Sequence, residues 1–142
     1  MATITIPRSN DPRRVSIEGT ILAAHQVECL PWLGNISKAT MGDVYFLFDN
    51  AQYVKKHWQN KNRIRVKSPE GFQWLTIPVI EVNKHFLPTN EVRMVNGTWK
   101  GQHLKAIELS YKKAPYFKEI FPDILRIYES EDELLVDFLL RF

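Results

Sequence analysis

Residues 20–52, TILAAHQVECLPWLGNISKATMGDVYFLFDNAQ, decide the fold of this chain. Residues 20–24 form a short apolar run, and residues 44–48 place five β-forming residues in a row. Continuous apolar runs of this length are typical of strands that are buried on both faces. Between them, Pro31 suits the first position of a helix, and a short helical segment follows until Gly42. The order strand, helix, strand predicts a parallel βαβ unit.

A β-hairpin is expected after this unit. Residues 63–67 alternate between charged and apolar side chains and run into Ser68-Pro69-Glu70-Gly71, a sequence that suits a type I turn. The return strand covers residues 72–79 and ends near Pro78, because proline cannot donate to a central ladder.

The C-terminal part is expected to be mainly helical. A short strand over residues 91–95 precedes a helix that begins at Trp99 and stops before Pro115. Residues 130–133 have the form of a capping box, with Ser130 as the N-cap. The apolar face of the helix after it continues to the last residue, which predicts a domain that is shortened relative to its relatives or completed by a partner subunit. That face consists of Leu134, Leu135, Phe138, Leu139 and Phe142.

Length and composition favour one folded domain. The chain has 142 residues, of which 44% are hydrophobic and 25% charged, close to ordinary globular averages. We therefore predict a Rossmann-like three-layer α/β domain over residues 20–142, with a short parallel sheet core (βαβ), a β-hairpin and C-terminal helices. An N-terminal extension or edge hairpin over residues 1–19 precedes it.

Several function classes lack support in the sequence. Cys29 is the single cysteine, and the four histidines have no recognisable ligand spacing, so we expect neither a metal nor another cofactor. No apolar run approaches 18 residues, and the N-terminus has no basic region followed by an apolar stretch. We therefore expect a cytoplasmic protein with no membrane partner.

The charge is unevenly distributed along the chain. The net charge is only +3, but no carboxylate lies between Asp49 and Glu70. Two interpretations of the cations in that stretch stay open: a solvated face, or a site for a phosphate-bearing ligand, which needs several donors in one place. The cations are Lys55, Lys56, Lys61, Arg63, Arg65 and Lys67.

Polar side chains follow both predicted parallel strands. His25 ends the first strand and Asp49 follows the second, and ligands of open α/β sheets bind at the carboxyl ends of the strands. His25 is our candidate general base or phosphate donor, and its alternative role is to anchor the loop by a hydrogen bond. Asp49 is the candidate to accept a proton or orient a sugar hydroxyl, and its alternative role is to cap a helix.

The remaining candidates are substrate-binding residues. Amide side chains form hydrogen bonds with hydroxyl groups, and cationic side chains neutralise phosphate. Aromatic rings stack on a sugar or a base, although packing is the favoured role of the tryptophans. The candidates are Gln26, Gln52, Asn60 and Asn62 (amides), Lys56 and Arg63 (cations), and Trp32, Tyr53 and Trp58 (rings).

These motifs together resemble the WbqC-like protein family. The matching residues are His25-Gln26, the segment 30–34, Asp43-Val44, Asp49, Gln52-Tyr53, Lys56, Trp58, Asn60, the segment 62–64 and the segment 73–79. The match is close over roughly residues 20–80 and thin from Trp99 to Phe117. It makes residues 20–142 similar to the N-terminal part of the family, whose members are typically longer by a further α/β half.

The resemblance implies a setting in bacterial surface polysaccharide biosynthesis of the O-antigen type. Its expected activity is that of a transferase that modifies a nucleotide-activated sugar or related phosphorylated metabolite, with aminoacyl (glycine) or acyl transfer. The expected partners are this small molecule and a second copy of the chain or a longer paralogue. Two alternatives stay open: a module that binds single-stranded nucleic acid through residues 53–67, although nucleic acid is the less favoured partner, and a non-catalytic truncated partner of a longer paralogue.

Overall fold

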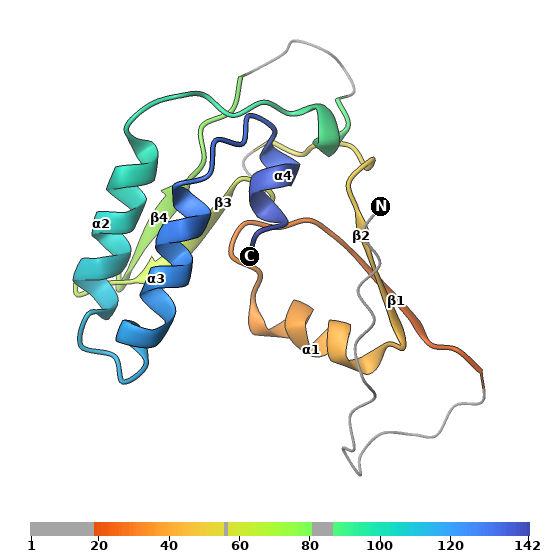
Figure 1. Cartoon of the computed structure of the whole chain (residues 1–142), viewed down its shortest axis with the longest axis horizontal. Helices are drawn as coiled ribbons and strands as arrows, with labels where there is room; N and C mark the ends of the chain where they lie inside the picture. The colour runs from red at the N-terminus through yellow and green to blue at the C-terminus, as the bar shows by residue number, and fades with distance from the viewer. Residues whose placement is uncertain (1–18, 56, 81–86) are drawn as a thin grey trace.

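The computed structural model describes residues 19–55, 57–80 and 87–142. The predicted edge hairpin over residues 1–19 therefore lies almost wholly outside the described residues, as does Lys56. The fold is α/β, with two short sheets and helices around them, as the sequence predicts (Figure 1).

The predicted βαβ unit is present. β1 (Leu22–Gln26) pairs in parallel with β2 (Val44–Phe48), and α1 (Leu33–Met41) connects them and packs on β1. The register runs from Leu22 opposite Val44 to Gln26 opposite Phe48, so the carboxyl ends of both strands meet at one edge. β1 begins and ends two residues later than predicted, and His25 and Gln26 are therefore its last residues rather than the start of a loop.

The predicted β-hairpin is also present. β3 (Lys61–Arg65) and β4 (Phe72–Thr76) are antiparallel, and β3 lies two residues earlier than the sequence indicates. The Gly71 N–H donates to the Ser68 carbonyl at 3.0 Å and closes the turn. Gly71 has a φ of +73°, which glycine adopts at little cost.

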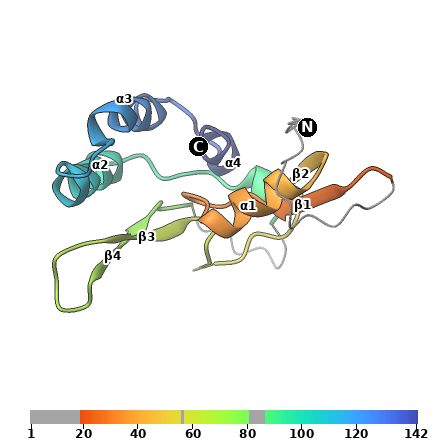
Figure 2. The same ribbon diagram turned by 90° about the horizontal axis from the view of Figure 1, so that it is seen from below.

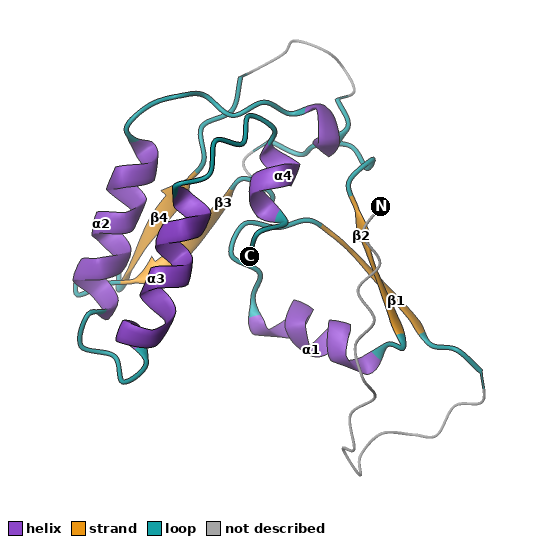
Figure 3. Ribbon diagram, viewed as in Figure 1, coloured by secondary structure: helices purple, strands orange, loops and turns teal. Residues whose placement is uncertain are grey.

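Three helices follow a short 3-10 helix, η1 (Thr89–Glu91) (Figure 3). They are α2 (Trp99–Tyr111), α3 (Phe117–Tyr128) and α4 (Leu135–Leu139). α2 and α3 pack against each other and lie on one side of the β3–β4 hairpin (Figure 2). α2 matches the prediction, whereas α3 was not predicted. With 13 residues, α2 is the longest helix of the described residues, so none of these helices has the length to cross a membrane.

Two C-terminal predictions are wrong, for one physical reason. Residues 91–95 form isolated bridges instead of a strand, and Ser130 is not the N-cap of α4, which begins five residues later. The Leu135 N–H donates to the Val92 carbonyl at 2.8 Å, and the Met94 N–H donates to the Glu133 carbonyl at 2.8 Å. These contacts keep the segment before α4 extended, so tertiary pairing overrides the local capping signal.

The main core lies between the hairpin and the C-terminal helices. Phe138 is fully buried and meets Trp99 and Tyr128 edge to face, with ring centroids 5.5 and 5.3 Å apart. Val27 and Cys29, which follow β1, belong to the same core. The loop between β1 and α1 is therefore anchored in the helical half of the molecule, and its residues Cys29 and Leu30 contact Asn62 of β3.

Candidate functional site

A pocket of about 480 Å³ opens between the loop after β1 and the start of β3. We call it the Trp32–Trp58 pocket. Its lining residues are Glu28, Trp32, Trp58, Asn62 and Arg63. Four of these five are predicted substrate-binding residues, and they come from three separate segments of the chain.

Asn62 holds the loop that forms one wall of this pocket. Its side-chain Nδ2 donates to the carbonyl oxygens of Cys29 at 2.9 Å and Leu30 at 2.7 Å. Leu30 has a φ of +50°, an uncommon value for a bulky residue and one that costs energy. The Cys29 N–H also donates to the Trp58 carbonyl at 3.0 Å. The Asn62 amide therefore fixes the loop and also lines the pocket, and its role in orienting substrate stays a prediction.

Trp32 forms an exposed wall of the pocket, with 66% of its surface accessible. Its ring lies directly against Gly34, where an added Cβ would come within 2.3 Å of the ring. Glycine at position 34 therefore permits this ring position.

Trp58 belongs to an aromatic group on the outer face of the hairpin. Its ring centroid lies 5.6 Å from that of Trp74, and Lys61 Nζ lies 4.5 Å from the Trp74 ring. Arg63 Cζ lies 5.1 Å from the ring centroid of Phe72. Cations and rings thus form a continuous surface that leads out of the pocket.

His25 adjoins the pocket through Glu28. His25 Nδ1 lies 2.9 Å from the Gln26 carbonyl oxygen and 3.9 Å from Glu28 Oε1. A carbonyl only accepts, so Nδ1 carries the proton in the neutral ring and Nε2 keeps its lone pair. The side chains of His25 and Glu28 are 27% and 13% exposed. Asn35 Nδ2 donates to Glu28 Oε2 and holds that carboxylate in place.

Asp49 lies at the edge of the sheet that the sequence predicts. It follows β2 directly, next to the pair formed by Gln26 and Phe48, and its backbone carbonyl accepts a hydrogen bond from the Asn90 N–H at 2.8 Å. Among the described residues, no ion pair links Asp49 to His25; the carboxylate that contacts His25 is Glu28.

A buried amide connects the end of β1 to the loop after β2. Gln59 is 1% exposed, and its Nε2 donates to Thr89 Oγ1 at 3.0 Å and lies 3.4 Å from Gln26 Oε1. Its Oε1 accepts from the Val54 N–H at 2.7 Å, and the Thr89 hydroxyl donates to the Ala51 carbonyl. This network positions Gln26 and fixes the loop after β2.

The other predicted site residues lie away from this pocket or outside the described residues. Asn60 is buried and donates to the Ile77 carbonyl at 3.0 Å, so it braces the hairpin. Gln52 pairs with Pro88, and the Tyr53 N–H donates to the Leu87 carbonyl at 2.8 Å. Lys56 lies outside the described residues.

The family model of the WbqC-like protein family matches residues 26–142. The chain belongs to this family. A similar curated protein is Uncharacterized protein Rv1507c of Mycobacterium tuberculosis (strain ATCC 25618 / H37Rv), 33% identical over 121 residues. The match covers 84% of this chain and 51% of that protein, so the chain spans about half the length of its relative. No solved structure matches the chain significantly.

Sequence reasoning missed two residues of this WbqC-like chain that matter to the site, Glu28 and Gln59. Glu28 is a lone carboxylate three residues after His25, a spacing that would have been a usable signal. The sequence points to Asp49 instead, because it follows the second predicted strand. Gln59 could not be found in this way, since its partners Gln26 and Thr89 lie about 30 residues away on either side.

Cys29 of the WbqC-like chain is fully buried. Burial raises the pKa of its thiol to about 12, because the thiolate would lack solvation. The thiol is therefore protonated at neutral pH and unsuited to act as a nucleophile. The described residues contain no group of three or more potential metal ligands of the His, Cys, Asp and Glu types.

Proposed function

We propose that this WbqC-like chain binds a nucleotide-activated sugar, or a related phosphorylated metabolite, in the Trp32–Trp58 pocket. In this proposal the chain acts as a transferase in the biosynthesis of bacterial surface polysaccharide of the O-antigen type. The observation that carries the proposal is the composition of the pocket, in which one guanidinium, one carboxylate and two indole rings surround about 480 Å³.

Each part of such a ligand has a complementary group in the pocket. The guanidinium of Arg63 is exposed and offers the forked donor geometry that phosphate oxygens accept. Trp32 and Trp58 offer flat apolar faces to a base or to the C–H face of a sugar. Glu28 accepts hydrogen bonds from sugar hydroxyls.

His25 is the proposed general base of the transfer. Its Nε2 lone pair takes the proton from the attacking amine or hydroxyl, and Glu28, 3.9 Å from Nδ1, stabilises the resulting imidazolium. The proton then passes to the leaving group of an activated aminoacyl or acyl donor, so no net charge accumulates. Asp49, at the same sheet edge, is proposed to orient the acceptor hydroxyl.

Calorimetric titration with a panel of nucleoside diphosphate sugars tests this proposal. Arg63→Ala should weaken binding about tenfold to a hundredfold, the range of a hydrogen bond to a charged group. Arg65→Ala is the matched control, because it removes the same charge from the same strand but does not line the pocket. Equal affinity of wild type and Arg63→Ala would contradict the proposal, as would the absence of binding to every member of the panel.

Binding of single-stranded nucleic acid is the second candidate, favoured by the outer face of the hairpin. The register places Arg63 opposite Trp74 and Arg65 opposite Phe72, so cations alternate with rings along one face. Proteins that bind single-stranded nucleic acid use aromatic rings that stack on the bases and cations that neutralise the phosphate backbone, and this face offers both. Affinity for an oligonucleotide should then fall steeply with salt, whereas a flat salt dependence eliminates this candidate.

A non-catalytic role beside a longer paralogue is a third candidate. It is favoured by the match of this chain to only 51% of its relative. Co-purification with a full-length family member from the same cell would support it, and recovery of the chain without such a partner would count against it.

A further inference from the structure

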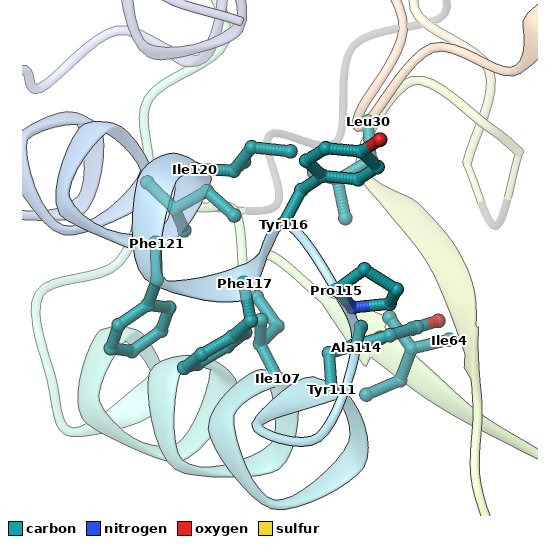
Figure 4. A pocket seen from close by; sticks show the side chains of 11 residues that line it. Leu30, Ile64, Ile107, Tyr111, Ala114, Pro115, Tyr116, Phe117, Ile120 and Phe121 are labelled. Carbon is teal, nitrogen blue, oxygen red and sulfur yellow. The ribbon is translucent and has the colours of Figure 1, made fainter.

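A second, apolar cavity of about 350 Å³ lies between the hairpin and the connection of α2 to α3. Figure 4 shows its side chains, which are aliphatic or aromatic throughout. The hydroxyls of Tyr111 and Tyr116 are the polar side-chain atoms of this lining. The Tyr111 hydroxyl already accepts a hydrogen bond from the Arg65 N–H at 3.0 Å.

The rim of this cavity is open to solvent. Tyr116 is 65% exposed and Ile120 is 54% exposed, although both side chains line an apolar hollow (Figure 4). Water gains few hydrogen bonds in such a space, so an apolar ligand is favoured there. A dry cavity of about 150 Å³ holds benzene, which has six carbons, and by that ratio this cavity has room for an alkyl chain of up to roughly fourteen carbons.

A cationic groove of about 680 Å³ adjoins the apolar cavity, and Tyr111 lines both. The groove runs between β3 and the C-terminal end of α2. Its charged lining residues are all basic among the described residues: Arg65, Lys67, Lys112 and Lys113. Such a concentration of one sign of charge favours an anionic group.

We propose that the cavity and the groove together bind a single-chain amphiphile with an anionic head group. The alkyl chain occupies the apolar cavity, and the head group, a phosphate or carboxylate, lies among the cations on the far side of Tyr111. This site is separate from the Trp32–Trp58 pocket, with which it shares no lining residue, and does not depend on the function proposed there.

The apolar half of the proposal is tested with a chain-length series. Hexyl, octyl and decyl phosphate are titrated calorimetrically into the full chain, each below its critical micelle concentration. Burial of one methylene changes the affinity about fourfold, so each step of two carbons should tighten binding roughly fifteenfold. Ala114→Phe should abolish this gain, because residue 114 is exposed and lines the cavity, which the larger ring would fill.

The cationic half is tested with a change of head group. Octyl glucoside, which has the same chain and a neutral head, should bind at least tenfold more weakly than octyl phosphate. The double variant Lys112→Ala/Lys113→Ala should lose a similar factor for octyl phosphate. Lys105→Ala is the control, since it removes a charge from the exposed surface of α2 and lines neither hollow.

Several results would overturn this assignment. They are affinity independent of chain length, equal binding of inorganic phosphate, an Ala114→Phe variant that binds like wild type, and binding only to micelles or to phospholipid vesicles. If Ala114→Phe does not fold by circular dichroism, Ile120→Asp replaces it, because this exposed position places a charge at the mouth of the cavity. Nucleotide-sugar affinity should stay unchanged in all these variants, so failure here is distinguishable from failure of the proposed function.

Discussion

The Asn62 side chain donates a 2.7 Å hydrogen bond to the carbonyl of Leu30, a residue held at a φ of +50°. The same amide donates to Cys29, so one side chain on β3 fixes the loop after β1. This contact couples the parallel βαβ unit to the hairpin, and the Trp32–Trp58 pocket lies where the two meet.

Removal of this amide should destabilise the fold. Asn62→Ala leaves two backbone carbonyls without their donor, and we expect a loss of about 1–3 kcal/mol in the free energy of unfolding. Asn62→Asp should lose more, because it sets a carboxylate against two carbonyl oxygens. Urea denaturation measures both variants, and an Asp variant as stable as wild type would refute this role.

Substitution of Gly34 should move the Trp32 ring without harm to the fold. The added Cβ of Gly34→Ala would lie 2.3 Å from that ring, so the ring must swing away, while alanine favours the helix by roughly 0.5–1 kcal/mol. We expect unchanged or higher stability, altered tryptophan fluorescence and weaker nucleotide-sugar binding.

Gly101→Ala provides the control for that experiment. It is also a helical glycine, but a Cβ there meets nothing within 4 Å. It should raise stability by a similar amount and leave ligand affinity unchanged. Equal ligand affinity in both variants would argue against Trp32 as a wall of the binding site.

Stability should decrease in mild acid because of His103. This histidine is 5% exposed, and burial lowers its pKa from 6.5 to about 4, although its contact with the Thr76 carbonyl acts in the opposite direction. A lowered pKa means that the unfolded chain binds the proton first, so stability is full above pH 6.5 and falls between pH 6.5 and 4.

The size of this effect is at most about 3 kcal/mol. Denaturant unfolding of wild type and His103→Gln across this pH range measures it, and the difference between the two isolates His103 from the carboxylates. If the free energy of unfolding changed with pH in the same way for wild type and for His103→Gln, His103 would not titrate as described.

The Cys29 thiol should resist modification in the folded protein. It is fully buried with a pKa raised to about 12, so both access and thiolate fraction are low at pH 8. Reaction with Ellman's reagent should be slow in buffer and rapid in denaturing urea. Rapid reaction in buffer would mean that the loop after β1 opens readily.

The local elements with strong patterns were predictable from sequence. Val44–Phe48 is a strand with the predicted bounds, because five β-forming residues in a row strongly favour an extended backbone. The hairpin turn at Gly71 follows from proline and glycine placed where a type I turn needs them. These elements also predict the parallel pairing of the two strands, and hence the sheet edge that carries His25 and Asp49.

Elements that depend on tertiary contacts were not predictable. α3 has apolar residues at helical spacing, Phe117, Ile120, Phe121 and Ile124, but Pro122 in its interior reads as a helix breaker. The Ser130 capping box fails because Leu135 pairs with Val92, more than 40 residues earlier.

The candidate site was likewise only partly predictable. Its rings and Arg63 could be named from residue type, whereas the contact of Glu28 with His25 depends on how the loop after β1 turns.

A crystal structure of the chain soaked with a nucleoside diphosphate sugar tests the central claim most directly. We expect the diphosphate oxygens within hydrogen-bond distance of the Arg63 guanidinium, and the base or sugar against the ring of Trp32 or Trp58. A diphosphate bound elsewhere, with Arg63 and both rings free of ligand, would contradict the proposed function.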